Sequence, residues 1–269
     1  MFAFFTRMIR DKFKLFLIYS LTAIGLLEMY VALFPTLQKN AVQFDAVMKT
    51  FPPEMFKAMN MDPASLSMGN FESYLSSEFM SFLWPILAIV FAISLANYIC
   101  INEVDKGTIE ALISLPAKRI KIFIQRYFAG LLLLFCFCLI SIFAVIPLAE
   151  IHNINYVFAN YKVAAVGLML FIWVVYSTAT FVSVIFSEKG KSSLTVGGIL
   201  VLMYVFNIIS ALNSQLVNLK YFSIFYYFNG SELLGKGAYP EHIFIALGGV
   251  ALAMVILSVI VFRKRDLAI

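Results

Sequence analysis

Six long apolar runs constrain this chain more than any other feature of its sequence. Each run is close to the roughly 20 mostly apolar residues that a helix needs to cross a bilayer. The chain is 62% hydrophobic and only 13% charged, whereas globular domains average about 25% charged residues. We therefore predict an all-α integral membrane protein, with residues 1–269 forming a single transmembrane domain. The expected spans are Leu15–Phe34, Phe79–Ile101, Tyr127–Leu148, Val163–Phe186, Leu194–Leu212 and Ile243–Phe262.

The distribution of Lys and Arg predicts the orientation of these spans, because cytoplasmic loops are enriched in both residues. With the N-terminus inside, fourteen of them fall on the cytoplasmic side and six on the outer side. The first run is too long for a signal peptide and lacks a small-residue cleavage site, so we expect it to be retained. Abundant Phe, Ile, Lys and Asn are typical of an AT-rich bacterial genome. We expect a multi-pass protein of the bacterial plasma membrane with both termini in the cytoplasm.

The first 14 residues mix Phe, Met and Ile with four cations. This pattern is typical of a basic helix that lies in the membrane interface, with its cations toward anionic headgroups. A simple positively charged flank of the first span is the alternative.

Two segments on the outer side are long enough to fold. Prolines divide residues 35–78 into pieces, and we expect small amphipathic helices at Leu37–Thr50, Pro53–Met61 and Asn70–Ser77, the last of which could continue into the second span. In residues 213–242, the aromatic stretch Tyr221–Phe228 is too short to cross the membrane. A short interfacial or re-entrant helix is expected there, because lipid does not tolerate an open strand edge.

A charged segment, residues 102–119, separates the second and third runs and has the pattern of a short helix. Thr108 can cap its start and Gly107 permits the preceding turn. Glu110 then suits the positive end of the helix dipole, and Pro116 ends the helix. Such a short helix is marginal alone, so we expect it to dock on another protein. Its apolar face is formed by Ile109, Leu112 and Ile113.

The sequence predicts no catalytic, cofactor or metal site in this chain. Gly190-Lys191-Ser192 resembles the end of a phosphate-binding loop, but Ile185 occupies the position of the first glycine. His152 and His242 lie outside the spans without a third ligand in view. The basic residues are scattered between apolar runs rather than gathered on one face, which argues against nucleic-acid binding.

Glu28 stands inside the first span, where a carboxylate is costly and usually faces protein or water. It could line a translocation path, pair with a polar group such as Asn207 in the fifth span, or remain protonated and structural. A channel or ion-coupled secondary transporter that uses Glu28 is therefore an alternative function.

The segment Glu103–Arg119, E-V-D-K-G-T-I-E-A-L-I-S-L-P-A-K-R, resembles the loop after the second span in permease subunits of ABC-2-type transporters. Val261–Leu267 is similar to the closing F-x-[RK]-[RK]-D-L of that family. The six spans and the aromatic segment before the last span also fit, although residues 35–78 are longer than in the simplest members. The matching positions in the charged segment are Glu103, Gly107, Thr108, Glu110, Leu112, Ser114 and Pro116.

This resemblance implies an exporter in which residues 102–119 form a coupling helix that docks on a separate ATPase subunit. ATP and Mg²⁺ would be bound by that subunit, and a second permease chain, identical or not, would complete the path. The few polar groups in the spans favour an amphipathic peptide or a lipid-like cargo. The expected coupling residues are Glu103, Gly107, Thr108, Ile109, Glu110, Leu112, Ile113 and Pro116.

Overall fold

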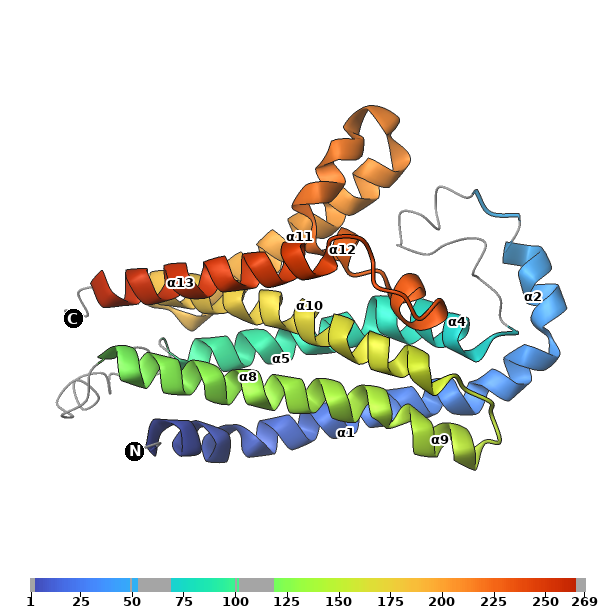
Figure 1. Cartoon of the computed structure of the whole chain (residues 1–269), viewed down its shortest axis with the longest axis horizontal. Helices are drawn as coiled ribbons and strands as arrows, with labels where there is room; N and C mark the ends of the chain where they lie inside the picture. Colours follow the sequence, from blue (N-terminus) through green and yellow to red (C-terminus); the bar gives the residue numbers. More distant parts are fainter. Residues whose placement is uncertain (1–2, 49, 53–68, 100, 102–118, 265–269) are drawn as a thin grey trace.

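The structure is a computed structural model that describes residues 3–48, 50–52, 69–99, 101 and 119–264. Within these ranges every regular element is a helix, and the long helices lie side by side with both chain termini at one end of the bundle (Figure 1). We call this the terminal end. Six helical stretches are long and apolar enough to cross a membrane, which confirms the all-α class and the six expected spans. They are Ala3–Lys39, Phe71–Ile99, Arg119–Ile151, Phe158–Ile185, Lys189–Leu212 and Phe244–Lys264.

The first span starts earlier than its apolar run. Helix α1 is continuous from Ala3 to Lys39, because residues 3–14 contain no Gly or Pro that would interrupt it. A separate interfacial helix is therefore not seen. Residues 3–14 form the first part of this one helix, and whether they lie in the membrane interface or flank the span stays a prediction.

The second span also starts earlier than expected. Asn70 caps α4 (Phe71–Leu75) by accepting a hydrogen bond from the Ser73 amide at 2.9 Å. The helix continues through the π-helical stretch η1 (Ser76–Leu83) into α5 (Trp84–Ile99), so the predicted helix Asn70–Ser77 does run into the span.

Only part of the remaining outer loop is described. Helix α2 (Ala41–Met48) lies within the predicted helix Leu37–Thr50. The predicted helix Pro53–Met61 lies outside the described residues.

The third span bends near its end. Helix α8 (Arg119–Phe143) is followed by α9 (Val145–Ile151). Pro147 has no amide proton to donate to the Phe143 carbonyl four residues earlier, which explains the break. His152 is the C-cap of α9, and the next residue, Asn153, adopts a positive φ of 54°, which is common just after a helix ends.

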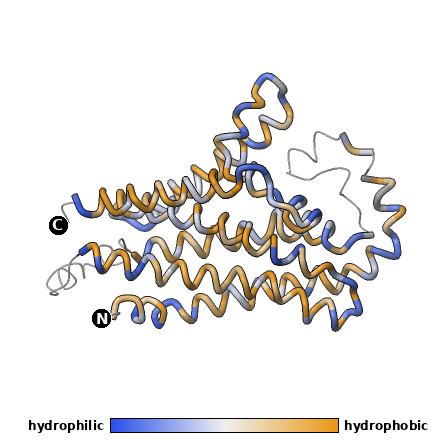
Figure 2. The backbone as a smooth tube through the Cα atoms, in the orientation of Figure 1, coloured by the Kyte–Doolittle hydropathy of each residue, from blue (hydrophilic) through white to orange (hydrophobic). Residues whose placement is uncertain are grey.

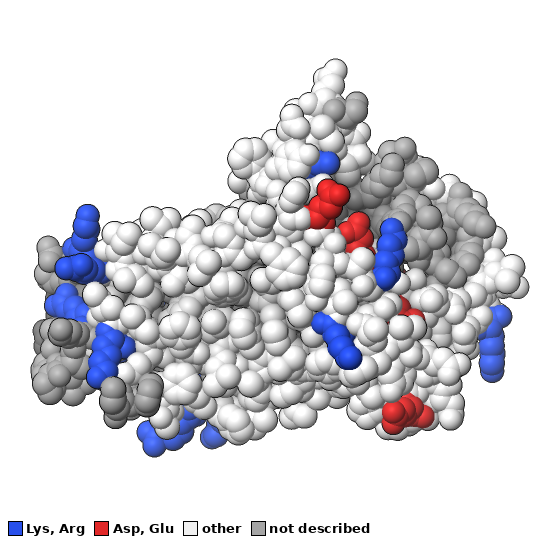
Figure 3. Space-filling view, viewed as in Figure 1, with Lys and Arg blue, Asp and Glu red and all other residues white. Residues whose placement is uncertain are grey.

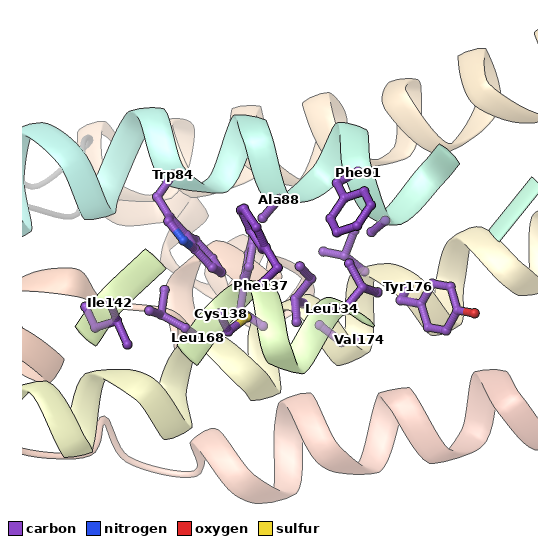
Figure 4. Close-up of a cluster of buried hydrophobic side chains, with 14 of the residues drawn as sticks. Trp84, Ala88, Phe91, Leu134, Phe137, Cys138, Ile142, Leu168, Val174 and Tyr176 are labelled. Atoms are coloured by element: carbon purple, nitrogen blue, oxygen red, sulfur yellow. The ribbon is translucent and has the colours of Figure 1, made fainter. Parts of the chain in front are cut away.

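Helix α10 (Phe158–Ile185) lies at the centre of the bundle, packed against α5, α8 and α13 (Gly249–Lys264). Figure 4 shows the core where α5, α8 and α10 meet, with Trp84 and Phe137 stacked at a ring-centroid distance of 5.9 Å. The Trp84 indole N–H donates to the Ser141 hydroxyl at 2.8 Å, so its polar group is satisfied inside the apolar core. Hydrophobic residues follow the middle of the long helices, with hydrophilic residues toward both ends (Figure 2).

The chain leaves the bundle in the fifth span. Helix α11 (Lys189–Leu212) and the following 3₁₀ helix η2 (Ser214–Phe222) form a hairpin that projects sideways (Figure 1). Helix α12 (Ile224–Tyr227) returns to the bundle, so the predicted short helix in Tyr221–Phe228 is present. Two π-helical stretches, η3 (Ser231–Gly235) and η4 (Phe244–Gly248), lead into α13.

Candidate functional site

The predicted coupling residues all lie outside the described part of the chain. The two helices that hold their segment are described: α5 ends at Ile99 and α8 begins at Arg119. Both meet the segment at the terminal end (Figure 1). The residues outside the description are Glu103, Gly107, Thr108, Ile109, Glu110, Leu112, Ile113 and Pro116.

A buried arginine joins these two helices. Arg126, about two turns into α8, is only 1% exposed. Its Nη1 donates to the carbonyl oxygens of Ile99 at 3.0 Å and Tyr98 at 3.4 Å. Both carbonyls lie in the last described turn of α5, toward the negative end of its helix dipole, where a cation is favourable. Arg126 therefore fixes the end of α5 to α8.

Tyr98 extends this connection to α1. Its hydroxyl donates to Oδ2 of Asp11 at 2.5 Å, and the guanidinium of Arg126 lies 5.3 Å from the centroid of its ring. Lys12 lies 4.7 Å from the same ring, and Arg7 forms an ion pair with Asp11 at 3.7 Å. The side chains of α1, α5 and α8 thus meet at one level of the bundle.

Asn97 connects the same turn of α5 to α11. Its side-chain amide donates to the Ser193 hydroxyl at 2.8 Å, and its carbonyl oxygen accepts from Ser192 at 3.0 Å. From α10, the Ser183 hydroxyl donates to the Ala96 carbonyl at 3.3 Å. The last turn of α5 is therefore hydrogen-bonded to four other spans.

The charges on the molecule are unevenly distributed. Lys and Arg gather at the terminal end of the face in Figure 3, whereas the acidic residues visible there lie in the other half, among further basic residues. The cytoplasmic location of the terminal end was predicted from these same Lys and Arg residues and stays a prediction.

Glu28 is paired at the opposite end of the bundle. His152, which follows α9, lies with Nε2 2.8 Å from Glu28 Oε1, while Glu28 Oε2 is buried without a hydrogen-bond partner. Asn207, the suggested partner, is instead buried on α11. From the sequence we expected His152 to be an ordinary loop residue. Its pairing with Glu28 was not foreseen, because 124 positions separate the two residues and no local pattern connects them.

Glu72 is a second carboxylate that sequence reasoning missed. It is buried, and its Oε1 accepts a hydrogen bond from the Val157 amide at 2.6 Å, just before α10 begins. A carboxylate at this position satisfies a free amide and suits the helix dipole. No local pattern connects Glu72 with Val157, because 85 positions separate them in the sequence.

A polar cavity of about 370 Å³ lies beside Glu72 and His152. Tyr156 lines it and donates to Glu150 at 3.2 Å. Desolvation raises the pKa of Tyr156, and its hydrogen bond to the Glu150 carboxylate raises it further. The hydroxyl therefore remains a neutral donor at physiological pH.

An apolar groove of about 280 Å³ runs between α5 and α11. Gly197 opens it, because a side chain at this position would meet nothing within 4 Å. The residues that line it include Pro85, Ile89, Val90, Gly197, Leu200 and Val201.

The site and the fold define a class of protein. Six apolar helices with a polar cluster at the terminal end form a multi-pass membrane protein, and within the described ranges no group of three His, Cys, Asp or Glu residues could hold a metal ion. Residues 5–267 match the family described as ABC-2 family transporter protein. The chain belongs to this family, which confirms the resemblance seen in the sequence and makes it a permease of an ABC transporter, a transport component rather than a catalytic one. No curated protein matches the chain.

Proposed function

We propose that this chain is the transmembrane subunit of an ATP-driven exporter and that the predicted coupling segment, residues 102–119, receives the force of a separate ATPase subunit. We call the part of it that lies outside the described residues the 102–118 segment. ATP and Mg²⁺ would be bound by that subunit. Besides the family match, one observation carries this proposal: the buried Arg126 holds the end of α5 against α8. A movement of the segment reaches the bundle only if the helices on both sides of it move together. Arg126 joins these two helices, α5 and α8, where they meet the segment.

A second permease chain completes the path in this proposal. The apolar groove between α5 and α11 and the sideways hairpin of α11 and η2 support the choice of this face. Small residues such as Gly197 let helices in a membrane approach closely. Whether the second chain is identical is left to the experiment below.

The cargo class in this proposal is an amphipathic peptide or a lipid-like molecule. The groove supports it, because almost all of its lining is apolar. Glu28 and Asn207, suggested for the path by the sequence, do not line this groove, and their place in the path stays a prediction.

The test uses the docking face of the segment. Leu112→Asp places a charge on the face predicted to contact the ATPase, whereas Ala111→Asp places it about 100° away around the helix. In complexes purified with the partner ATPase subunit, Leu112→Asp should abolish the permease-dependent change in ATP hydrolysis, and Ala111→Asp should retain it. Equal hydrolysis in wild type, Leu112→Asp and ATPase alone would contradict the proposal. Size and mass of the complex report whether one or two permease chains are present.

A further inference from the structure

We infer that Tyr98, Asp11 and Arg126 are positioning residues that make α1 move with the base of the 102–118 segment. This inference rests on the proposed function, because it concerns how force leaves that segment. It goes further by naming the route: from the end of α5 to α8 through Arg126, and from α5 to α1 through Tyr98 and Asp11.

The three helices form a closed triangle at the terminal end. Arg126 joins α8 to the carbonyls that end α5, and Tyr98 joins α5 to Asp11 of α1. The third side is the packing of α1 against α8, where Met8 lies so close to Gly130 that a Cβ there would be 2.9 Å from the Met8 methyl group. Three elements connected pairwise at one level cannot shift independently.

If the role of Arg126 were only to satisfy the carbonyls of Tyr98 and Ile99, an arginine would not be needed there. Burying a guanidinium is expensive, and a hydroxyl or amide could satisfy a carbonyl at lower cost. The planar guanidinium can donate to carbonyls while its flat face lies against an aromatic ring, a geometry that the compact ammonium group of lysine does not offer. Arg126 makes both kinds of contact, with Ile99 and with Tyr98. The residue thus holds the same tyrosine that reaches α1.

The bond between Tyr98 and Asp11 is the side of the triangle that can be opened most selectively. A hydrogen bond to a carboxylate is about twice as strong as a neutral one. Tyr98→Phe removes it while keeping the ring beneath Arg126 and Lys12. Helices α5 and α8 remain joined in this variant, so only the link to α1 is lost.

The experiment measures the distance between α1 and α5 in the complete complex with its ATPase, in lipid nanodiscs. Spin labels are attached to cysteines at Phe13 on α1, which is 47% exposed, and at Ser94 on α5, which is half-buried. The native Cys100, Cys136 and Cys138 are replaced by Ala. Distances are recorded without nucleotide and after trapping with ATP and vanadate, so no knowledge of the cargo is required.

In the otherwise native chain, the α1–α5 distance should be the same in both states although α5 moves. In Tyr98→Phe and in Asp11→Asn, the trapped state should contain about tenfold more of a displaced α1, which corresponds to the loss of one charge-assisted hydrogen bond. The double variant, with both Tyr98→Phe and Asp11→Asn, should contain the same fraction of displaced α1 as either single variant. Tyr156→Phe is the matched control, because it removes a tyrosine–carboxylate bond at the opposite end.

Two outcomes would overturn the inference. If the α1–α5 distance of Tyr98→Phe in the trapped state equals that of the native chain, the bond does not transmit motion. If the distribution of α1–α5 distances broadens equally with and without nucleotide, the bond has a structural role only. Failure of the proposed function looks different: labels at Ser94 and on the ATPase would then show no nucleotide-dependent movement of α5 in the native chain.

Discussion

Helices α10 and α11 follow each other in the chain and have similar hydropathy, yet they occupy opposite environments. In the most apolar 18 residues of each, 67% are buried in α10 and 22% in α11. Helix α10 is surrounded by α5, α8 and α13, whereas the second half of α11 departs from the bundle (Figure 1). In a membrane, apolar composition therefore shows that a helix spans, but not whether it faces protein or lipid.

Small residues account for much of this difference. Ala164, Ala165, Gly167 and Ala179 of α10 are buried against neighbouring helices, as expected where backbones approach closely. Gly197 and Gly198 of α11 have open space around them instead. Both helices carry small residues, but only those of α10 are already used within one chain.

The largest effect is expected where α8 meets α10. Gly130→Leu places a Cβ 2.8 Å from the ring of Tyr176, which is fully buried and bonded through its hydroxyl to the Tyr127 carbonyl. We expect a loss of about 3 kcal/mol or failure to accumulate folded protein, measured by thermal unfolding in detergent. Gly198→Leu on α11 is the control and should unfold like the wild type. If Gly130→Leu and Gly198→Leu unfold at similar temperatures, the two helices do not differ in how tightly they are packed within the chain.

The groove on α11 should respond in a different way. Gly197→Leu fills space that no part of this chain occupies, so the fold should be unaffected while association with a second permease chain weakens about tenfold. Dilution of the complex with mass measurement would detect this change. Gly198 does not line the groove, so Gly198→Leu should leave the association with the second chain unchanged. If Gly197→Leu leaves association unchanged, the second chain binds elsewhere.

A smaller effect is expected from a hydroxyl between α8 and α10. Tyr127→Phe removes the acceptor of the Trp173 indole N–H at 2.9 Å and the partner of the Ser177 hydroxyl at 2.9 Å. Leaving a buried donor unpaired costs about 1–3 kcal/mol, and because Trp173 is partly buried we expect a loss at the lower end of this range. Thermal unfolding should show this loss, whereas Tyr204→Phe on α11 should change stability by less than half as much. A larger loss at Tyr204 would contradict the contrast.

The smallest effect is expected at Glu28. Interhelical hydrogen bonds in membranes contribute about 0.6 kcal/mol on average, and Gln at this position keeps an oxygen for His152. Glu28→Gln should therefore cost less than about 1 kcal/mol of stability, and Glu28→Leu more. Transport by the complex tests the path hypothesis separately: unchanged transport and assembly with Leu would exclude a role of Glu28 in the path.

The number of spans could be predicted from the sequence, because each run is long enough to cross a bilayer. Several of their starts could not, since hydropathy falls at charged residues whereas helices continue past them, but the predicted ends Phe186 and Leu212 agree with the structure to within one residue. The second span was expected from Phe79 and begins at Phe71, with Glu72 and Glu78 inside the helix. The third was expected from Tyr127 and begins at Arg119, so Arg126 belongs to it.

The polar contacts were beyond reach of sequence reasoning for a different reason. Arg126 and Tyr98 are separated by 28 residues and Tyr98 and Asp11 by 87. The pairing of Glu28 with His152 spans a still longer stretch. None of these pairs has a local periodicity, so only the packing of the helices brings them together. The coupling residues, in contrast, were found from local pattern and resemblance, and they remain a prediction.

The most direct test of the account is a crosslinking measurement on the 102–118 segment in the complex with its ATPase. Single cysteines at Ile109, Leu112 and Ala111, in a chain without its native cysteines, are treated with a short thiol-reactive crosslinker. The account predicts ATPase adducts from Ile109 and Leu112 but not from Ala111. Absence of adducts at all three positions, in a complex whose ATP hydrolysis is still changed by the permease, would contradict it.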